Sequence, residues 1–283
     1  MDQPSDTAAL LRSWLTAQAD TGLAWLDASA AGIAAETTGR TLGTAFAAAP
    51  RQVGRDELPP CRVQEAQLTG WTRDQAARVF LLLACHAREP QFLQALDRLF
   101  GAADLAELVT LYQALPLLPF PERHTARAAE GVRSNMLPVF RAVAVGNAYS
   151  AAWLDDGAWN QMVVKAVFVG CSLHGIEGLD RRANPALARM LVDYARERRA
   201  ASRDVVPDLW RPVGPFATDD RALQELRCAL GAEDVEKQSA AALALAASPH
   251  PEARALLATR PELAGPIAAG RLSWQALAER TAA

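Results

Sequence analysis

Apolar residues recur at helical spacing along almost the whole of this chain, and Pro and Gly interrupt them at short intervals. Phe92, Leu96 and Leu99, for example, share one face of a helix expected to begin at Pro90 and to end at Gly101. We find no convincing strand pattern, because alternation of apolar and polar residues is lacking. The periodicity therefore predicts an all-α protein built as a compact stack of antiparallel helices.

Capping and helix-breaking residues predict where several of these helices begin and end. Pro50 is expected to close an Ala-rich helix, and residues 51–70 are expected to form a loop. Thr72 is then predicted to cap an apolar helix that is buried on several sides. Pro138 is expected to kink one long helix that runs from Glu122 to Val145.

Two further starts are marked by a capping side chain. Asp155 and Asp156 at one helix start, and Asn184 at the other, are predicted to accept amide hydrogens of the first helical turn, and Pro185 suits the first helical position after Asn184. From Asp219 to Arg280, short helices rich in Ala and Leu follow one another, separated by Gly and Pro. We expect a HEAT-like helical array there, although no fixed period recurs.

Composition excludes several classes of protein. A net charge of −3 and a pI of about 5.9 give no general attraction to nucleic acid. Apolar runs such as Val79 to Cys85 are far shorter than the roughly 20 residues of a membrane span. The first residues lack the basic and apolar regions of a secretory signal. We therefore expect a cytoplasmic protein without a direct membrane span.

The four cysteines have no short paired spacing, and this favours reduced thiols over a zinc site. Phosphate loops, dinucleotide fingerprints, nucleophile elbows and paired-histidine motifs are also missing from the sequence. We therefore expect neither a metal nor a cofactor. Cys171 and His174 lie three residues apart and would form a nucleophilic or metal-binding pair only with further groups. The alternative is that both residues are structural.

Lys165 is one of only two lysines among the 29 basic residues and lies in an apolar helical stretch. A desolvated lysine binds its proton less tightly and can act as a nucleophile or base. The alternatives are that its side chain reaches solvent or pairs with a carboxylate. One hypothesis is that Lys165 faces a partly buried polar site.

Asp180, Arg181 and Arg182 follow a glycine-containing turn near the start of a helix. Two guanidinium groups and free amide hydrogens would suit an anion such as a carboxylate or phosphate. The alternative is an Arg–Asp network that fixes the loop to a neighbouring helix.

The polar residues that stand out fall between positions 135 and 182, and we predict that they line a ligand site. We assign no catalytic residue among them. The predicted ligand-binding residues are Asn135, Asn147, Trp159, Asn160, Lys165, His174, Asp180, Arg181 and Arg182.

The chain resembles the EboA-domain family of metabolite traffic proteins. The resemblance covers about Trp71 to Phe216 best and the two ends loosely. It rests on the stretches SNMLPVF (134–140), DDGAWNQMV (155–163), GLDRRANP (178–185) continuing to MLVDY (190–194), and LWRPVGPF (209–216). We accordingly expect an EboA-like helical domain over 1–216 and an Ala-rich helical extension over 217–283 that packs on it.

The resemblance implies a role in a bacterial natural-product pathway, in secondary metabolism. In such a pathway a few proteins move a biosynthetic precursor toward the membrane or periplasm. It implies a small-molecule metabolite as ligand, and as partners a membrane prenyltransferase-like protein and several soluble pathway proteins, through which the chain would associate with the membrane. It brings no catalytic residues with it. We therefore expect a non-enzymatic binding or scaffold protein. The alternative is an enzyme that modifies the metabolite through Lys165, or through Asp180 with His174.

Overall fold

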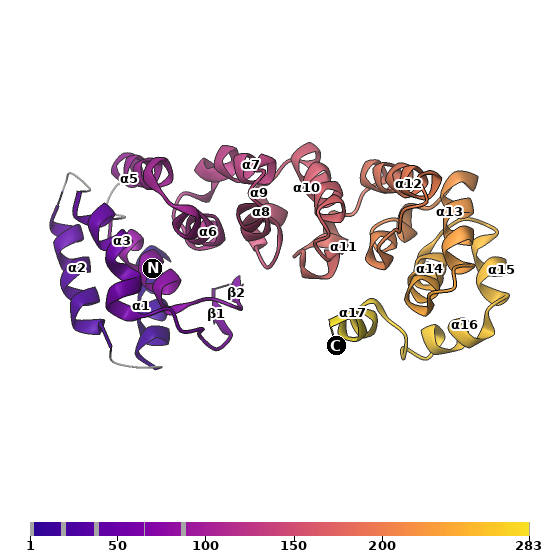
Figure 1. Cartoon of the computed structure of the whole chain (residues 1–283), viewed down its shortest axis with the longest axis horizontal. Coiled ribbons are helices and arrows are strands. Elements are labelled where there is room, and N and C mark those ends of the chain that lie inside the picture. The colour runs from indigo at the N-terminus through magenta and orange to yellow at the C-terminus, as the bar shows by residue number, and fades with distance from the viewer. Residues whose placement is uncertain (1–2, 18–20, 37–39, 65, 86–88, 283) are drawn as a thin grey trace. The chain divides into compact units, whose positions relative to one another are not determined.

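The computed structural model describes residues 3–17, 21–36, 40–64, 66–85 and 89–282. It divides into two compact units, Met1–Leu154 and Asp155–Ala283, which we describe separately (Figure 1). Helices account for nearly all the regular structure of both units, and the described residues add a single two-stranded hairpin. The all-α prediction is confirmed, whereas the HEAT-like arrangement stays a prediction.

The first unit consists mainly of short helices. Its elements are α1 (Gln3–Thr16), α2 (Leu23–Ala35), α3 (Arg40–Val53), β1 (Cys61–Val63), β2 (Ala66–Leu68), α4 (Arg73–Leu83), α5 (Glu89–Ala102), α6 (Leu105–Gln113), the 3-10 turns η1 (Leu115–Leu117) and η2 (Pro121–His124), α7 (Thr125–Arg133), α8 (Leu137–Ala144) and α9 (Ala148–Trp153).

Helix α4 lies at the centre of this unit, where it packs against α1, α2, α3 and α6. It is buried nearly all round, as its apolar sequence predicts, and Thr72 begins it as expected. The main-chain N–H of Thr72 donates to Oε1 of Gln75 at 2.9 Å, which is half of a capping box. Two buried arginines, Arg73 and Arg78, also lie on this helix.

The prediction that Pro50 closes α3 is wrong, because the helix continues to Val53 with Pro50 inside it. Proline has no N–H and leaves the carbonyl of Phe46, four residues earlier, without its helical partner. Nε of Arg78 donates to that carbonyl oxygen at 3.0 Å. Nε of Arg73 likewise donates to the carbonyl of Val53 at 2.8 Å, where the helix ends.

The prediction of a loop over 51–70 without any strand is also wrong in part. β1 and β2 pair antiparallel, with Cys61 opposite Leu68 and Val63 opposite Ala66. Each strand has only three residues, which is too short for an alternating pattern to be recognised.

The predicted long helix with a kink at Pro138 is instead two helices. α7 ends at Arg133, and α8 begins at Leu137 with Pro138 in its first turn. A proline is tolerated in the first turn because the amide hydrogens there have no helical acceptor. Pro138 therefore marks a helix start.

The second unit is also helical. Its elements are α10 (Asp156–Phe168), η3 (Leu173–Gly175), α11 (Leu179–Arg182), α12 (Pro185–Ala200), η4 (Pro207–Trp210), η5 (Gly214–Phe216), α13 (Asp220–Leu230), α14 (Val235–Ala247), α15 (Ala253–Ala258), α16 (Pro261–Ala268) and α17 (Trp274–Ala282).

Two of the three predicted capping residues, Asp155 and Asn184, are N-caps, whereas Asp156 is the first residue of α10. Oδ1 of Asp155 accepts from the N–H of Ala158 at 2.7 Å, and Oδ1 of Asn184 accepts from the N–H of Leu187 at 2.9 Å. The helix starts of α10 and α12 are therefore as expected.

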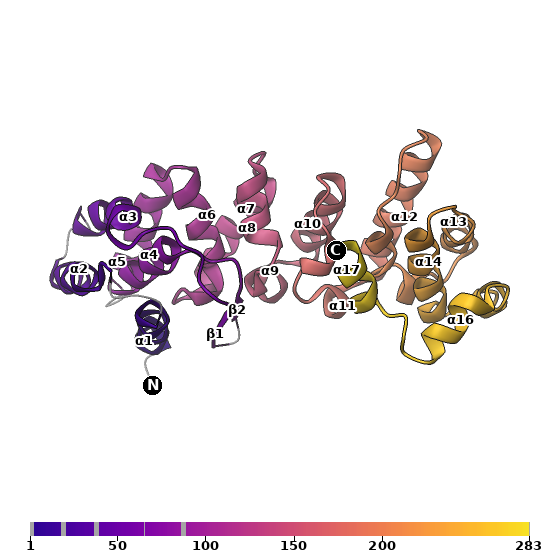
Figure 2. The same ribbon diagram turned by 60° about the horizontal axis from the view of Figure 1, so that its bottom comes forward.

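Helix α14 is the core of the C-terminal half of this unit and contacts α13, α15, α16, α17, η4 and η5 (Figures 1 and 2). At Gly214 the backbone of η5 comes so close to α14 that an added Cβ would lie 2.8 Å from Cα of Ala244. Residues of the predicted extension thus pack tightly on the end of the preceding region. The predicted boundary at residue 216 stays a prediction.

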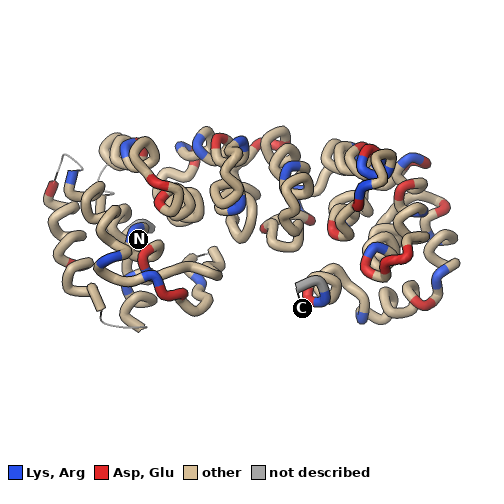
Figure 3. The backbone as a smooth tube through the Cα atoms, viewed as in Figure 1, with Lys and Arg blue, Asp and Glu red and all other residues tan. Residues whose placement is uncertain are grey.

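Positive and negative residues are interspersed along both units (Figure 3). On α12 and α13, for example, Arg199 holds both carboxylate oxygens of Glu225, at 2.6 and 3.0 Å. Among the described residues, no helix is long and apolar enough to cross a membrane.

Candidate functional site

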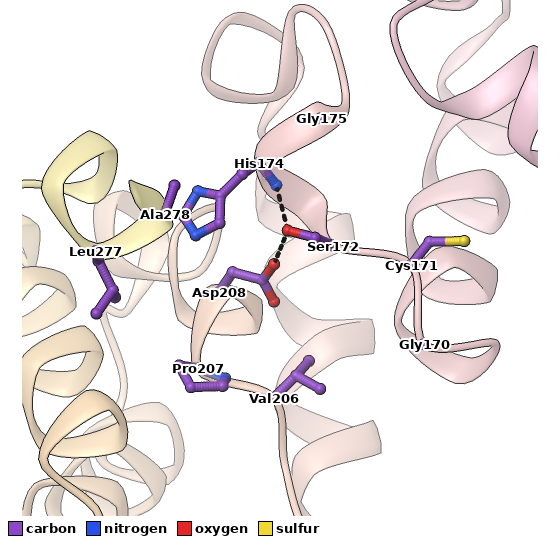
Figure 4. Close-up of a pocket in the computed structure, with 10 residues that line it drawn as sticks. All are labelled: Gly170, Cys171, Ser172, His174, Gly175, Val206, Pro207, Asp208, Leu277 and Ala278. Carbon is purple, nitrogen blue, oxygen red and sulfur yellow. Dashed lines mark hydrogen bonds between the residues drawn. The ribbon is translucent and has the colours of Figure 1, made fainter. Parts of the chain in front are cut away.

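The second unit contains a cavity of about 550 Å³, a size typical of small-molecule sites. Three segments form it: the chain from the end of α10 into η3, the start of η4, and one face of α17 (Figure 4). Its lining residues are Gly170, Cys171, Ser172, His174, Gly175, Val206, Pro207, Asp208, Leu277 and Ala278.

Asp208 holds two of these segments together. Its side chain lies in the first turn of η4, and its Oδ2 accepts from Oγ of Ser172 at 2.9 Å and from the N–H of Leu173 at 2.7 Å. Asp208 is only 7% exposed. Ser172 in turn accepts from the N–H of His174 at 3.2 Å, so the start of η3 is fixed against η4.

The ion pair between Arg211 and Asp180 positions His174. Nη1 of Arg211 lies 3.4 Å from Nδ1 of His174, while Nε and Nη2 of Arg211 hold the two carboxylate oxygens of Asp180 at 2.8 and 2.7 Å. A guanidinium group can only donate, so Nδ1 must accept and the ring proton of the neutral imidazole must lie on Nε2. Burial, the largest cause, lowers the pKa of His174, which favours this neutral form.

The cavity therefore offers a mainly apolar wall with few polar groups. Val206, Pro207, Leu277 and Ala278 supply apolar surface, and His174 and Asp208 supply polar contacts. No group of three or more His, Cys, Asp or Glu side chains able to hold a metal ion occurs in the described part of the chain. The arrangement suits binding of a small, largely apolar molecule.

Cys171 and His174 both line the cavity but do not form a pair. Figure 4 shows the sulfur of Cys171 pointing away from the imidazole of His174. The cysteine is buried and lies at the end of the segment that follows α10. The geometry therefore supports the alternative that Cys171 and His174 do not act together as a nucleophilic or metal-binding pair.

Trp159 and Asn160 on α10 and Arg182 at the end of α11 are not among the residues that line the cavity. The guanidinium of Arg182 lies 5.0 Å from the ring centroid of buried Trp159 and pairs with Asp156 at 2.9 Å. The amide of Asn160 exchanges hydrogen bonds with that of Asn184, at 3.3 and 2.9 Å. Nε1 of Trp159 is the only buried side-chain nitrogen or oxygen in the described residues that lacks a hydrogen-bond partner.

Lys165, Asp180 and Arg181 also lie outside the set of cavity-lining residues. Lys165 is half-buried on α10, and burial lowers its pKa. Asp180 is exposed and is held by Arg211, and Arg181 is exposed. Arg182 pairs with Asp156, so Asp180 and Arg182 each form an Arg–Asp ion pair, as in the alternative to an anion site.

The two predicted residues of the first unit have different surroundings. Asn135 is exposed between α7 and α8. Asn147 is buried: its Nδ2 donates to the carbonyls of Tyr112 and Ala142 at 3.0 and 2.7 Å, and its Oδ1 caps α9 by accepting from Tyr149 at 3.1 Å. All the polar atoms of the Asn147 side chain therefore serve the fold.

Sequence reasoning found His174 but missed Asp208, Ser172, Leu277 and Ala278. The one local signal for Asp208 is a carboxylate that follows Pro207 at the start of an apolar Leu-Trp pair. Its partner Leu173 is 35 positions away, so periodicity could not join the two. α17 belongs to the stretch least similar to the family and carried no polar signal.

One comparison with known proteins gives a match. The model of a family described as metabolite traffic protein EboA matches residues 7–214. No curated protein and no solved structure matches the chain.

Proposed function

The chain belongs to the EboA family of metabolite traffic proteins, whose model covers residues 7–214 of its 283 residues, and on that premise we propose that it binds a small metabolite without transforming it. The observation that carries the proposal is the cavity of about 550 Å³, whose wall is mainly apolar. Apolar contact area supplies most of the affinity in such sites, and a few polar groups fix the orientation of the ligand.

The arrangement of charged groups favours binding over catalysis. An enzyme using Asp180 would need its carboxylate near the bound molecule, but both oxygens of Asp180 are held by Arg211 at 2.7 and 2.8 Å. Lys165, the other candidate nucleophile or base, is not a lining residue of the cavity. Of the three, only His174 lines the cavity, and its ring contacts the guanidinium of Arg211, which is neither a general base nor a nucleophile.

The match to the EboA family suggests a wider role for the protein. We propose that the metabolite is a natural-product precursor, that the protein works in the cytoplasm, and that it passes the precursor toward the membrane or periplasm. A membrane prenyltransferase-like protein and soluble pathway proteins would be its partners. Leu277 and Ala278 lie beyond the matched residues, so one wall of the cavity is supplied by the extension.

A neutral aromatic probe tests whether the cavity binds apolar molecules. We expect N-phenyl-1-naphthylamine to bind saturably, with a rise in its fluorescence. Ala278→Trp, which fills the cavity from α17, should weaken binding at least about tenfold. Gln275→Trp, an exposed change on the same helix, should leave the affinity unchanged. Equal binding by both variants would place the probe elsewhere and contradict the proposed site.

A second experiment separates binding from catalysis. Small molecules extracted from the protein after purification from its native host would be identified by mass and returned to fresh protein. We expect each molecule to be recovered with unchanged mass. A change of mass that disappears in His174→Gln or Lys165→Ala would establish the enzyme alternative.

A further inference from the structure

The side chain of Asp208 is buried, and its carboxylate has no cationic partner among the described residues. No Lys, Arg or His nitrogen in the described part of the chain lies within ion-pair distance of it, and its two hydrogen bonds come from neutral groups, Ser172 and the N–H of Leu173. Both of these bonds end on Oδ2. Within the described residues, Oδ1 accepts no hydrogen bond, and Asp208 lines the cavity (Figure 4).

The neighbouring basic groups do not supply a counter-ion. Arg211 is the nearest guanidinium along the chain, and it is engaged with both oxygens of Asp180. His174 is held as a neutral donor by the approach of Arg211 to its Nδ1 at 3.4 Å. Within the described residues, Oδ1 of Asp208 has no hydrogen bond and is not among the buried side-chain atoms that lack a partner, so this oxygen is open to the cavity. The negative charge of Asp208, which no cation of the described residues balances, is therefore available to a group that enters the cavity.

We propose that the cavity takes a small, largely apolar molecule that carries a primary ammonium group, and that this group pairs with Oδ1 of Asp208. The inference rests on the proposed function, because it names the chemical class of the bound metabolite. Val206, Pro207 and Leu277 contact the apolar body, and the ammonium group supplies the counter-ion. A hydroxyl group can also donate to Oδ1, but it leaves the carboxylate charge unbalanced. A metal ion would need more ligands than one carboxylate and one imidazole.

Three probes of similar size and different charge test the proposal. They are 2-phenylethylamine, 2-phenylethanol and 3-phenylpropionate, each measured by displacement of N-phenyl-1-naphthylamine and by calorimetry at pH 7. We expect the amine to bind at least about tenfold more tightly than the alcohol, and the carboxylate to bind most weakly. This test uses only the unmodified protein, so its result does not depend on whether a variant folds.

The variant Asp208→Asn tests whether the preference for the amine over the alcohol depends on the charge of Asp208. The amide oxygen can still accept from Ser172 and Leu173, while the negative charge is removed. We expect the preference for the amine over the alcohol to fall to within about threefold. Asp234→Asn, the same charge change at an exposed helix cap outside the cavity, should keep the full preference.

The outcomes distinguish this inference from the proposed function. Equal displacement by all three probes would overturn the ammonium class and leave an apolar binding cavity. A preference for the amine that survives in Asp208→Asn would also overturn it. Failure of N-phenyl-1-naphthylamine itself to bind would reject the proposed function.

Discussion

Arg211 donates two hydrogen bonds of nearly equal length to the carboxylate of Asp180, from Nε to Oδ1 at 2.8 Å and from Nη2 to Oδ2 at 2.7 Å. This bidentate geometry fixes the plane of the guanidinium, so that its remaining Nη1 lies beside Nδ1 of His174. Asp180 therefore acts on the cavity indirectly, by setting which nitrogen of His174 carries the proton. Asp180 and His174 were both predicted from the sequence as ligand-binding residues. They are connected through Arg211, which was not predicted.

Replacing Arg211 with Met should raise the pKa of His174. The positive charge of Arg211 lowers that pKa, while the nearby carboxylates of Asp208 and Asp180 raise it, so removal of the arginine leaves only the raising charges. The imidazole signal, assigned with His174→Gln, would be followed by NMR as a function of pH. Arg254→Met, an exposed change on α15, serves as the control. An unchanged titration in Arg211→Met would contradict the assigned contact.

Asn147 and Asn135 should differ sharply in their effect on stability. Asn147→Asp would place a carboxylate against the carbonyls of Tyr112 and Ala142, now 3.0 and 2.7 Å from its Nδ2. We expect a loss of about 3 kcal/mol, because two donors are lost and a charge is buried. Asn135→Asp is exposed and should cost less than about 0.5 kcal/mol. Urea unfolding measures both, and similar costs would mean that Asn147 is not the buried cap described.

Features encoded by neighbouring residues could be predicted, and features that depend on distant contacts could not. Asp155 and Asn184 cap α10 and α12 through bonds three residues away, so the sequence alone identifies them. The continuation of α3 past Pro50 depends on Arg78, which is 32 positions from the carbonyl of Phe46 that it satisfies. The cavity likewise depends on contacts between distant segments, since Asp208 bonds to Leu173 across 35 positions, and His174 is the one polar residue of the cavity that was predicted to bind a ligand.

Acid should destabilise the protein below neutral pH. Burial lowers the pKa of His124, which is 2% exposed with Nε2 at 2.8 Å from the carbonyl of Pro119, and it also lowers the pKa of His174. Below about pH 6.5 the unfolded chain therefore binds protons that the folded chain does not, and stability falls with pH. Each histidine contributes at most about 1.4 kcal/mol per pH unit.

His124→Gln keeps a donor for Pro119 and removes one titrating group, so the free energy of unfolding should depend less steeply on pH. Urea unfolding between pH 7.5 and pH 6 measures the slope. Burial raises the pKa of the Glu177 carboxyl group, which therefore acts in the opposite direction, but this contribution is common to both proteins and cancels when their slopes are compared. A slope equal to that of the unmodified protein would show that His124 does not contribute.

Gly214→Ala tests how closely the end of the family-matched region packs on the C-terminal helices. A Cβ at this position would lie 2.8 Å from both Cα and the carbonyl oxygen of Ala244, so the backbone of η5 or α14 must shift. We expect a loss of about 2 kcal/mol in urea unfolding, the usual range for overpacking. Gly231→Ala is the matched control, since its Cβ would meet nothing nearer than 3.6 Å, and it should change stability by less than about 0.5 kcal/mol. A cost at Gly214 as small as that at Gly231 would mean that η5 and α14 can separate freely, and residues 217–283 would then not be packed firmly on the preceding region.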